Sequence, residues 1–346
     1  MTLTNDIQLT KRNLNCDLMR VICIVFVIMI HTGNPFSRGS ISAILFSTIV
    51  FLCNGIFFMI GGRFNLSKTF QCKEDYRKYY MGKLITILFP YILVTCLLNL
   101  WDTYDSGNWG GIILFFKRTY VAFMHTNYST HLWFMYPYLG MLLSTPFLSK
   151  MLQRISNWEL NLLFAIGLVW NIISIYMTRD FDITFSYSEW ILSGWCFLFF
   201  LGYYCIRIIN GSNKIVVYLL GIIGFVVTVV ARYLIPGNYK NGVDLAVAFI
   251  LFTMAIYTFF ERELVIKNKL LIKLINLISK YSFIIYLIHY SILTKIAPKI
   301  VSTSSVILSF LTRAGVTLIL SILVAIVLDI FIIMPVQKLM RSILCV

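Results

Sequence analysis

Long apolar runs recur along the whole sequence, separated by short stretches that hold most of the charged residues. A run of about 20 apolar residues crosses a bilayer as a helix, because a helix satisfies its own backbone hydrogen bonds there. The chain has 346 residues, 59% of them hydrophobic and 12% charged, which is far from the balance of a soluble domain. The sequence therefore predicts an all-α polytopic membrane protein with about ten transmembrane helices in one bundle.

The apolar runs and the basic loops between them predict a topology. We expect spans at about 17–33, 41–61, 84–101, 131–149, 160–177, 189–209, 215–235, 243–260, 281–297 and 306–334. Lys and Arg concentrate in a loop before residue 84 and in another at 261–280, and basic loops mark the cytoplasmic side. Both termini are then cytoplasmic.

Together with the remaining segments, the spans are predicted to form a single domain over residues 1–346. Residues 1–14 and 335–346 are expected to be cytoplasmic tails. Residues 102–130 form a long outer-side segment, whose apolar piece GIILFF is too short to cross and is expected at the interface.

The formal charge of +15 does not indicate nucleic-acid binding, because no basic domain or stacking platform is present. Positive charge on a membrane protein marks the cytoplasmic side and contacts anionic lipid headgroups. The eight cysteines are scattered through mostly apolar runs without CxxC or His/Cys spacing, so no metal site is expected. Membrane lipids are thus expected partners.

The first apolar run holds three ionisable residues, Asp17, Arg20 and His31. On a helix, the spacing of Arg20 and His31 places both on one face, roughly 16 Å apart along the axis. With the N-terminus inside, Arg20 suits an anionic ligand such as a nucleotide phosphate, and the deeper His31 suits proton transfer. The alternative is structural: an arginine paired with Asp17 that reaches the interface, and a histidine that hydrogen-bonds a neighbouring helix.

His131 opens the fourth predicted span in the sequence HLWF, close to Trp133 and Tyr138. Aromatic residues at a membrane boundary are normally belt residues, which explains Trp133 and Tyr138 better than it explains His131. Their faces also suit sugar rings. The segment is therefore a candidate outer mouth of a site.

His289 lies inside the ninth predicted span, where Ser282 and Tyr286 fall near its face at helical spacing. One histidine inside a membrane is often structural. Two or three that converge in one bundle favour chemistry, because the imidazole pKa is near neutral.

A basic run at residues 76–83 precedes Pro90. Topology alone explains such a run as a positive-inside cluster. The functional alternative is a phosphate clamp at the cytoplasmic mouth. The side chains available for that clamp are Arg77, Lys78 and Lys83, with Arg63 upstream.

The pattern Asp17-x-x-Arg20-x10-His31 resembles the Arg-x10-His signature of membrane-bound acyltransferase family 3, the integral-membrane O-acyltransferases of bacterial surface glycans. Four more segments resemble family landmarks in order: NGIFFMIGGRFNL (54–66), the basic run before LFPY (88–91), HLWFMYPYLGMLLSTPFL (131–148) and KYSFIIYLIHYSIL (280–293). The resemblance covers essentially the whole chain.

Two positions depart from the family pattern. Gly61 stands where a serine is usual. In the basic stretch, Lys83 fills one habitual basic position, and Thr86 stands at the one nearer the proline.

The resemblance implies a multi-pass O-acetyltransferase of the bacterial cytoplasmic (inner) membrane. It would move an acetyl or other acyl group from cytoplasmic acetyl-CoA to a hydroxyl of a capsule, lipopolysaccharide or lipid-linked saccharide. Acyl-CoA is a donor substrate on this interpretation, and no permanently bound cofactor is expected.

The resemblance also implies roles for the site residues. His31 is either a general base on the acceptor hydroxyl or itself accepts the acyl group, and Asp17 orients Arg20. The CoA phosphates would bind Arg20, Arg63, Arg77, Lys78 and Lys83. The sugar-facing mouth would be lined by His131, Trp133 and Tyr138. The core of the site would be supported by His289, Tyr286 and Ser282.

Two other classes remain open at this stage. Intramembrane arginine and histidine on ten spans also suit a transporter or flippase for a lipid-linked sugar or small solute, although the sequence lacks two matching halves with Gly/Pro-interrupted helices. The second class that remains open is a non-catalytic membrane partner of a glycan synthase. The sequence leaves open the acceptor, the acyl group, the leaflet of modification and the oligomeric state.

Overall fold

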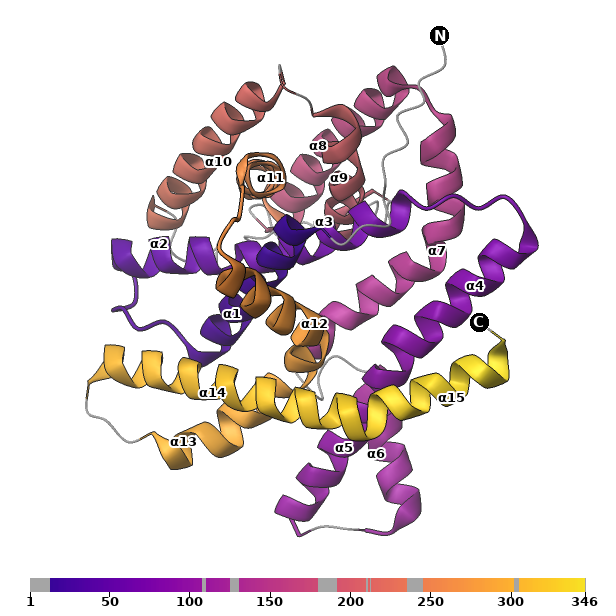
Figure 1. Cartoon of the computed structure of the whole chain (residues 1–346). Helices are drawn as coiled ribbons and strands as arrows, with labels where there is room; N and C mark the ends of the chain where they lie inside the picture. Colours follow the sequence, from indigo (N-terminus) through magenta and orange to yellow (C-terminus); the bar gives the residue numbers. More distant parts are fainter. Residues whose placement is uncertain are drawn as a thin grey trace. The chain divides into compact units, whose positions relative to one another are not determined.

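The structure, a computed structural model, describes residues 13–107, 110–124, 131–179, 192–209, 211, 213–234, 245–301 and 305–345. Every regular element in these residues is a helix, which confirms the all-α prediction (Figure 1). Six helical stretches among them are long and apolar enough to cross a membrane: Leu14–Thr32, Ile41–Leu66, Lys73–Asp105, Lys214–Leu234, Lys269–Ile300 and Val306–Leu344. Such a set is typical of a multi-pass membrane protein. The ten-span topology and the single domain stay predictions.

The chain divides into two compact units. The first consists of Met1–Cys23, Phe51–Thr69 and Thr145–Ser279. The second consists of Ile24–Val50, Phe70–Ser144 and Lys280–Val346. The division falls within three helices: α1 (Leu14–Thr32), α7 (Met135–Arg154) and α12 (Lys269–Ser291).

The first unit is built from packed apolar helices. Its members, besides parts of α1, α7 and α12, are α3 (Leu52–Leu66), α8 (Asn157–Arg179), α9 (Gly194–Ile208), α10 (Lys214–Leu234) and α11 (Val247–Glu263). Helix α9 packs against α3, and α10 packs along α11. The first part of the sixth predicted span, the end of the seventh and the start of the eighth fall outside the described residues.

Two glycines allow α3 and α9 to approach closely. A side chain at Gly62 would collide with the backbone of Phe199, and one at Gly202 with the backbone of Met59. Small residues of this kind are typical of helix interfaces in membranes, where close backbone contact replaces the hydrophobic effect. Helix α3 continues through Gly61 and Gly62, past the predicted end of the second span at residue 61, because Gly62 serves the helix interface rather than a turn.

Gly62→Leu is expected to destabilise the first unit by about 1–3 kcal/mol or more, because the added side chain must displace the α9 backbone. Thermal unfolding of the purified protein in detergent measures the effect. Gly140→Leu is the matched control, since a side chain there meets nothing within 4 Å. Equal melting temperatures for the two variants would contradict the assigned role of Gly62.

The second unit contains a helical hairpin and a long helix. Its members, besides parts of α1, α7 and α12, are α2 (Ile41–Val50), α4 (Lys73–Lys83), α5 (Phe89–Asp105), α6 (Ile112–Met124), α13 (Ala297–Ile300), α14 (Val306–Leu328) and α15 (Met334–Leu344). Helices α5 and α6 lie side by side (Figure 1), and Asn99 of α5 donates to Thr119 Oγ1 of α6 at 2.6 Å. The apolar piece GIILFF is the first part of α6, and its interfacial position stays a prediction.

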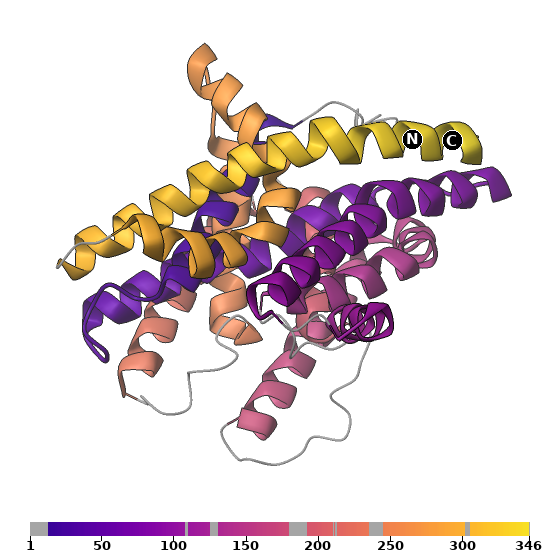
Figure 2. The ribbon, with the colours of Figure 1, turned by 90° about the horizontal axis from the view of Figure 1, so that it is seen from below.

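Among the prolines that lie in helices, three share one local arrangement. Pro90, Pro298 and Pro335 each follow a short π-helical segment, namely η1 (Leu84–Leu88), η4 (Ile292–Ile296) and η5 (Asp329–Ile333). A wider π turn accommodates the missing N–H and the ring of a proline, so the helix continues. Figure 2 shows α14 and α15 as one long rod for this reason.

Helices extend into segments that were predicted to be loops, so the loops are shorter in the structure than in the prediction. The predicted basic loop before residue 84 is helical over α4, the loop at 261–280 is helical from Lys269, and the tail after Pro335 is α15. These boundaries were wrong because lysine and arginine are good helix formers, so a helix does not end where its charged residues begin.

Candidate active site

Three of the four histidines converge in the second unit. His31 lies in the last turn of α1, His131 directly precedes the 3₁₀ turn η2 (Leu132–Phe134), and His289 lies in the last turn of α12. The ring centroids of His31 and His289 are 5.2 Å apart, those of His131 and His289 are 5.2 Å apart, and those of His31 and His131 are 6.3 Å apart. We call these three residues the histidine cluster.

Two members of the histidine cluster are held by backbone carbonyls. His289 Nδ1 lies 2.7 Å from the carbonyl oxygen of Tyr286, and His131 Nε2 lies 3.1 Å from that of Leu287. A carbonyl only accepts, so both nitrogens carry hydrogen and donate. The Tyr286 hydroxyl in turn donates to the His131 carbonyl, which ties η2 to α12.

The members of the cluster differ in exposure. His289 and His131 are 0% and 1% exposed, whereas His31 is only half-buried. His31 is therefore the member that a substrate can reach. The other two imidazoles are buried beside it.

His289 has a second notable feature. With hydrogen on Nδ1, the neutral imidazole has an acceptor lone pair on Nε2. This Nε2 is buried and has no hydrogen-bond partner among the described residues. A buried acceptor without a partner is energetically unfavourable, which makes this nitrogen a notable feature of the histidine cluster.

Aromatic rings surround the histidine cluster. The Tyr290 ring stacks on His131 at 5.2 Å and meets His31 edge-on at 5.4 Å. Tyr138 stacks on Phe134 at 5.3 Å. The sequence analysis did not single out Tyr290, although it directly follows His289 in the segment YLIHY.

Asp17 and Arg20 form an ion pair in the first unit. Arg20 Nη1 lies 2.7 Å from Asp17 Oδ1, and the Ser279 hydroxyl donates to the same oxygen at 2.6 Å. The guanidinium also lies over the Phe64 ring, 5.2 Å from its centroid. Asp17 is buried while the Arg20 side chain is 28% exposed, so the carboxylate orients a guanidinium that stays accessible.

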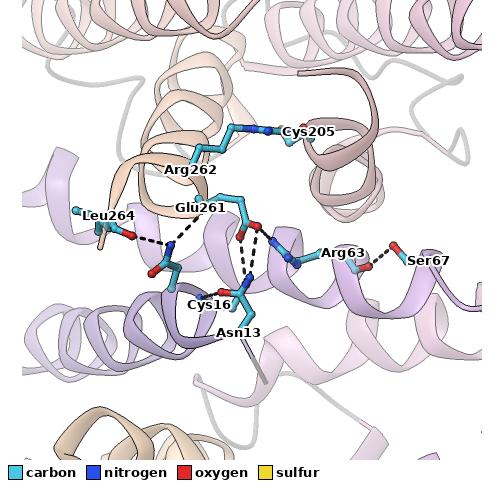
Figure 3. Close-up of polar contacts among 9 residues, drawn as sticks. Asn13, Cys16, Arg63, Ser67, Cys205, Glu261, Arg262 and Leu264 are labelled. Carbon is cyan, nitrogen blue, oxygen red and sulfur yellow. Dashed lines mark hydrogen bonds and ion pairs between the residues drawn. The ribbon is translucent and has the colours of Figure 1, made fainter. Parts of the chain in front are cut away.

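Arg63, a predicted phosphate-binding residue, lies in a polar cluster in the first unit (Figure 3). Its side chain is buried and paired with Glu261. Cys16 and Asn13 also contact the Glu261 carboxylate, at 3.5 Å each. The pair links α3 to α11, so the structure shows a packing role for Arg63, and its donor-binding role stays a prediction.

The other predicted basic residues lie on α4 in the second unit. Arg77 bonds Glu74 at 3.4 Å and the Leu344 carbonyl at 2.7 Å, and Lys78 lies 4.0 Å from Glu74. Both side chains are exposed. Lys83 lies over the Tyr79 ring, 5.4 Å from its centroid.

The remaining predicted site residues also lie in the second unit. Trp133 contacts Phe134, with ring centroids 6.2 Å apart, and Ser282 is buried on α12. Tyr286 contacts the rings of His131 and His289 at 6.0 and 6.1 Å. The histidine cluster thus includes or adjoins the predicted residues His31, His131, His289 and Tyr286.

Two of the three clustered imidazoles, His31 and His289, lie in candidate membrane spans, and the third lies beside η2. Ionisable groups inside the spans of a membrane protein often mark its function. The acyltransferase domain family, acyltransferase 3, matches residues 13–330, and the chain belongs to this family. No curated protein and no solved structure gave a match. The protein is thus a membrane acyltransferase with an acyl donor and an acceptor, which decides against the transporter and the non-catalytic partner.

Proposed function

We propose that the protein transfers an acetyl group from cytoplasmic acetyl-CoA to a hydroxyl of a cell-surface or lipid-linked saccharide, in the bacterial cytoplasmic membrane. The histidine cluster is the observation that carries this proposal. Acyl transfer to a hydroxyl needs a base at the reacting oxygen, and an imidazole is suited to that task at neutral pH.

His31 is the proposed base, because it is the accessible member of the cluster. Its imidazole removes the proton of the acceptor hydroxyl as the oxygen attacks the thioester carbonyl carbon. The tetrahedral intermediate then expels the CoA thiolate, which takes up the proton from His31. The products are the acetyl ester and CoA–SH, and the imidazole is neutral again.

A two-step route uses the same residue. The unprotonated ring nitrogen of His31 attacks the thioester carbonyl carbon, and the C–S bond breaks. The CoA thiolate takes up the proton of the other ring nitrogen, so CoA leaves as the thiol and an acetyl-imidazole remains. The acceptor hydroxyl oxygen then attacks the acetyl carbon, the C–N bond breaks, and the hydroxyl proton returns to the imidazole. The Nε2 acceptor of His289 supports either route, since it lies in a ring 5.2 Å from that of His31 and is able to hold a proton during the reaction. His289 is therefore a proposed positioning residue for His31.

Arg20 is the proposed donor-binding residue. Its guanidinium is partly exposed, and Asp17 holds it in one orientation. Guanidinium groups bind phosphates with paired hydrogen bonds, as the CoA phosphates require. Arg77, Lys78 and Lys83 add positive charge on α4, on the predicted cytoplasmic side. On the acceptor side, we propose that His131, Trp133 and Tyr138 contact the saccharide.

Binding of acetyl-CoA to the purified protein in detergent tests the donor assignment. Arg20→Ala is expected to weaken binding by about tenfold or more, because it removes charge-assisted hydrogen bonds to phosphate. His31→Ala is expected to bind near the wild-type affinity, because it acts in the chemical step. Unchanged binding by Arg20→Ala, or no binding by folded wild-type protein, would contradict the assignment.

A further inference from the structure

Helix α14 carries one charged residue, Arg313, in a sequence of 23 residues that is otherwise uncharged. A cation in such a helix is unfavourable in lipid unless a partner or a polar cavity receives it. Three other cations within the candidate spans have carboxylate partners, in the pairs Arg20–Asp17, Arg63–Glu261 and Lys280–Asp329. In the part of the chain that the structure describes, Arg313 has no such partner, and its Nε is buried without a hydrogen bond.

Arg313 lines a cavity of about 260 Å³ in the second unit. Polar lining residues are Thr32, Asn34, Ser305 and Ser309, and no carboxylate is among the described residues that line it. Ser305 caps α14, where its hydroxyl accepts from the Leu308 N–H at 3.4 Å, so the positive end of the helix dipole adds to the charge of Arg313. The cavity is therefore electropositive and polar.

The cavity adjoins the helix end that carries the proposed base. Thr32, a lining residue, directly follows His31 at the end of α1. Its volume approaches that of the smaller known ligand pockets, about 300 Å³. On the predicted topology α14 enters from the outer side, so Arg313 lies away from the cytoplasmic donor phosphates.

We propose that this cavity binds the acceptor, through a carboxylate or phosphate that pairs with Arg313. A guanidinium offers such an oxyanion two parallel hydrogen bonds, which fixes position as well as charge. This inference rests on the proposed function. If it holds, the acceptor is an acidic saccharide or a sugar phosphate. A hydroxyl of the bound sugar then lies near His31.

Binding of three monosaccharide probes tests this without any acyl transfer. Glucose, glucuronate and glucose 6-phosphate are titrated against the purified protein, and acetyl-CoA binding is measured in a separate titration. We expect one or both anionic probes to bind about tenfold more tightly than glucose, and the tighter one identifies the oxyanion. Arg313→Gln removes the preference and Arg313→Lys keeps part of it. Arg341→Gln, on exposed α15, leaves it unchanged.

Two results would overturn the proposal: no preference of the wild type for either anion, or a full preference in Arg313→Gln. Thermal unfolding of Arg313→Gln distinguishes a role of Arg313 in binding from a role in stabilising the fold. Removing an unpaired cation from a membrane helix is not expected to lower the melting temperature, whereas loss of a structural contact would lower it. If acetyl-CoA fails to bind, the proposed function fails, and the anion preference is still measured independently.

Discussion

His31→Ala is expected to lower the rate of acetyl transfer by about 10²–10⁴-fold, which is the usual contribution of a positioned general base. If His31 carries the acyl group, the loss is at the upper end of this range or beyond it. The rate is measured as CoA release from acetyl-CoA, quantified by chromatography, in membranes that contain the acceptor. Thiol reagents are unsuitable, because Cys72 and Cys345 are exposed.

The loss is expected in the chemical step and not in folding or donor binding. Among the described residues, the His31 side chain makes ring contacts with His131, His289 and Tyr290 and no hydrogen bond that holds the fold together. The variant should therefore express and bind acetyl-CoA as the wild type does. A wild-type rate in His31→Ala would show that the base is another group.

Glu261→Gln is expected to destabilise the protein by about 3–5 kcal/mol, because it leaves the Arg63 guanidinium buried without its counter-charge. Arg63 is only 9% exposed, so water cannot replace the lost carboxylate. Unfolding in detergent, by heat or denaturant, measures the loss. The double variant Arg63→Met, Glu261→Leu should recover much of it, since two apolar side chains replace the pair without a buried charge.

Glu263→Gln provides the matched control two residues further along. Glu263 pairs with Lys214 at 2.7 Å, but both side chains are 32% exposed. Surface pairs contribute about 0–1 kcal/mol, so this variant should unfold close to the wild type. Similar losses for Glu261→Gln and Glu263→Gln would contradict the packing role of Arg63, and weaker acetyl-CoA binding by a stable Arg63 variant would restore its predicted donor role.

The sequence predicted helix positions better than helix ends. Apolar runs have a clear length requirement in a bilayer, and each predicted span overlaps a helix in the described residues. The ends were wrong wherever a pattern normally associated with loops lies inside a helix. Pro335 lies in the first turn of α15, and Gly62 lies in a close contact with Phe199 that only three-dimensional packing reveals.

In the candidate site too, some features could be predicted from the sequence and others only from the folded structure. Asp17, Arg20 and His31 could be selected because each is an ionisable residue in one apolar run. Arg313 meets the same criterion in the tenth predicted span, so the same sequence signal was present there. The pairing of Arg63 with Glu261 could not be predicted, because the two residues are 198 positions apart in the sequence and only packing in the first unit joins them.

The most direct test of the central claim is transfer of labelled acetyl from acetyl-CoA to the saccharide fraction of membranes, with wild type compared to His31→Ala. The account predicts label in a base-labile ester with the wild type, and label at background level with His31→Ala at equal expression and equal acetyl-CoA binding. Equal labelling by both proteins would contradict the placement of the chemistry at His31 in the histidine cluster.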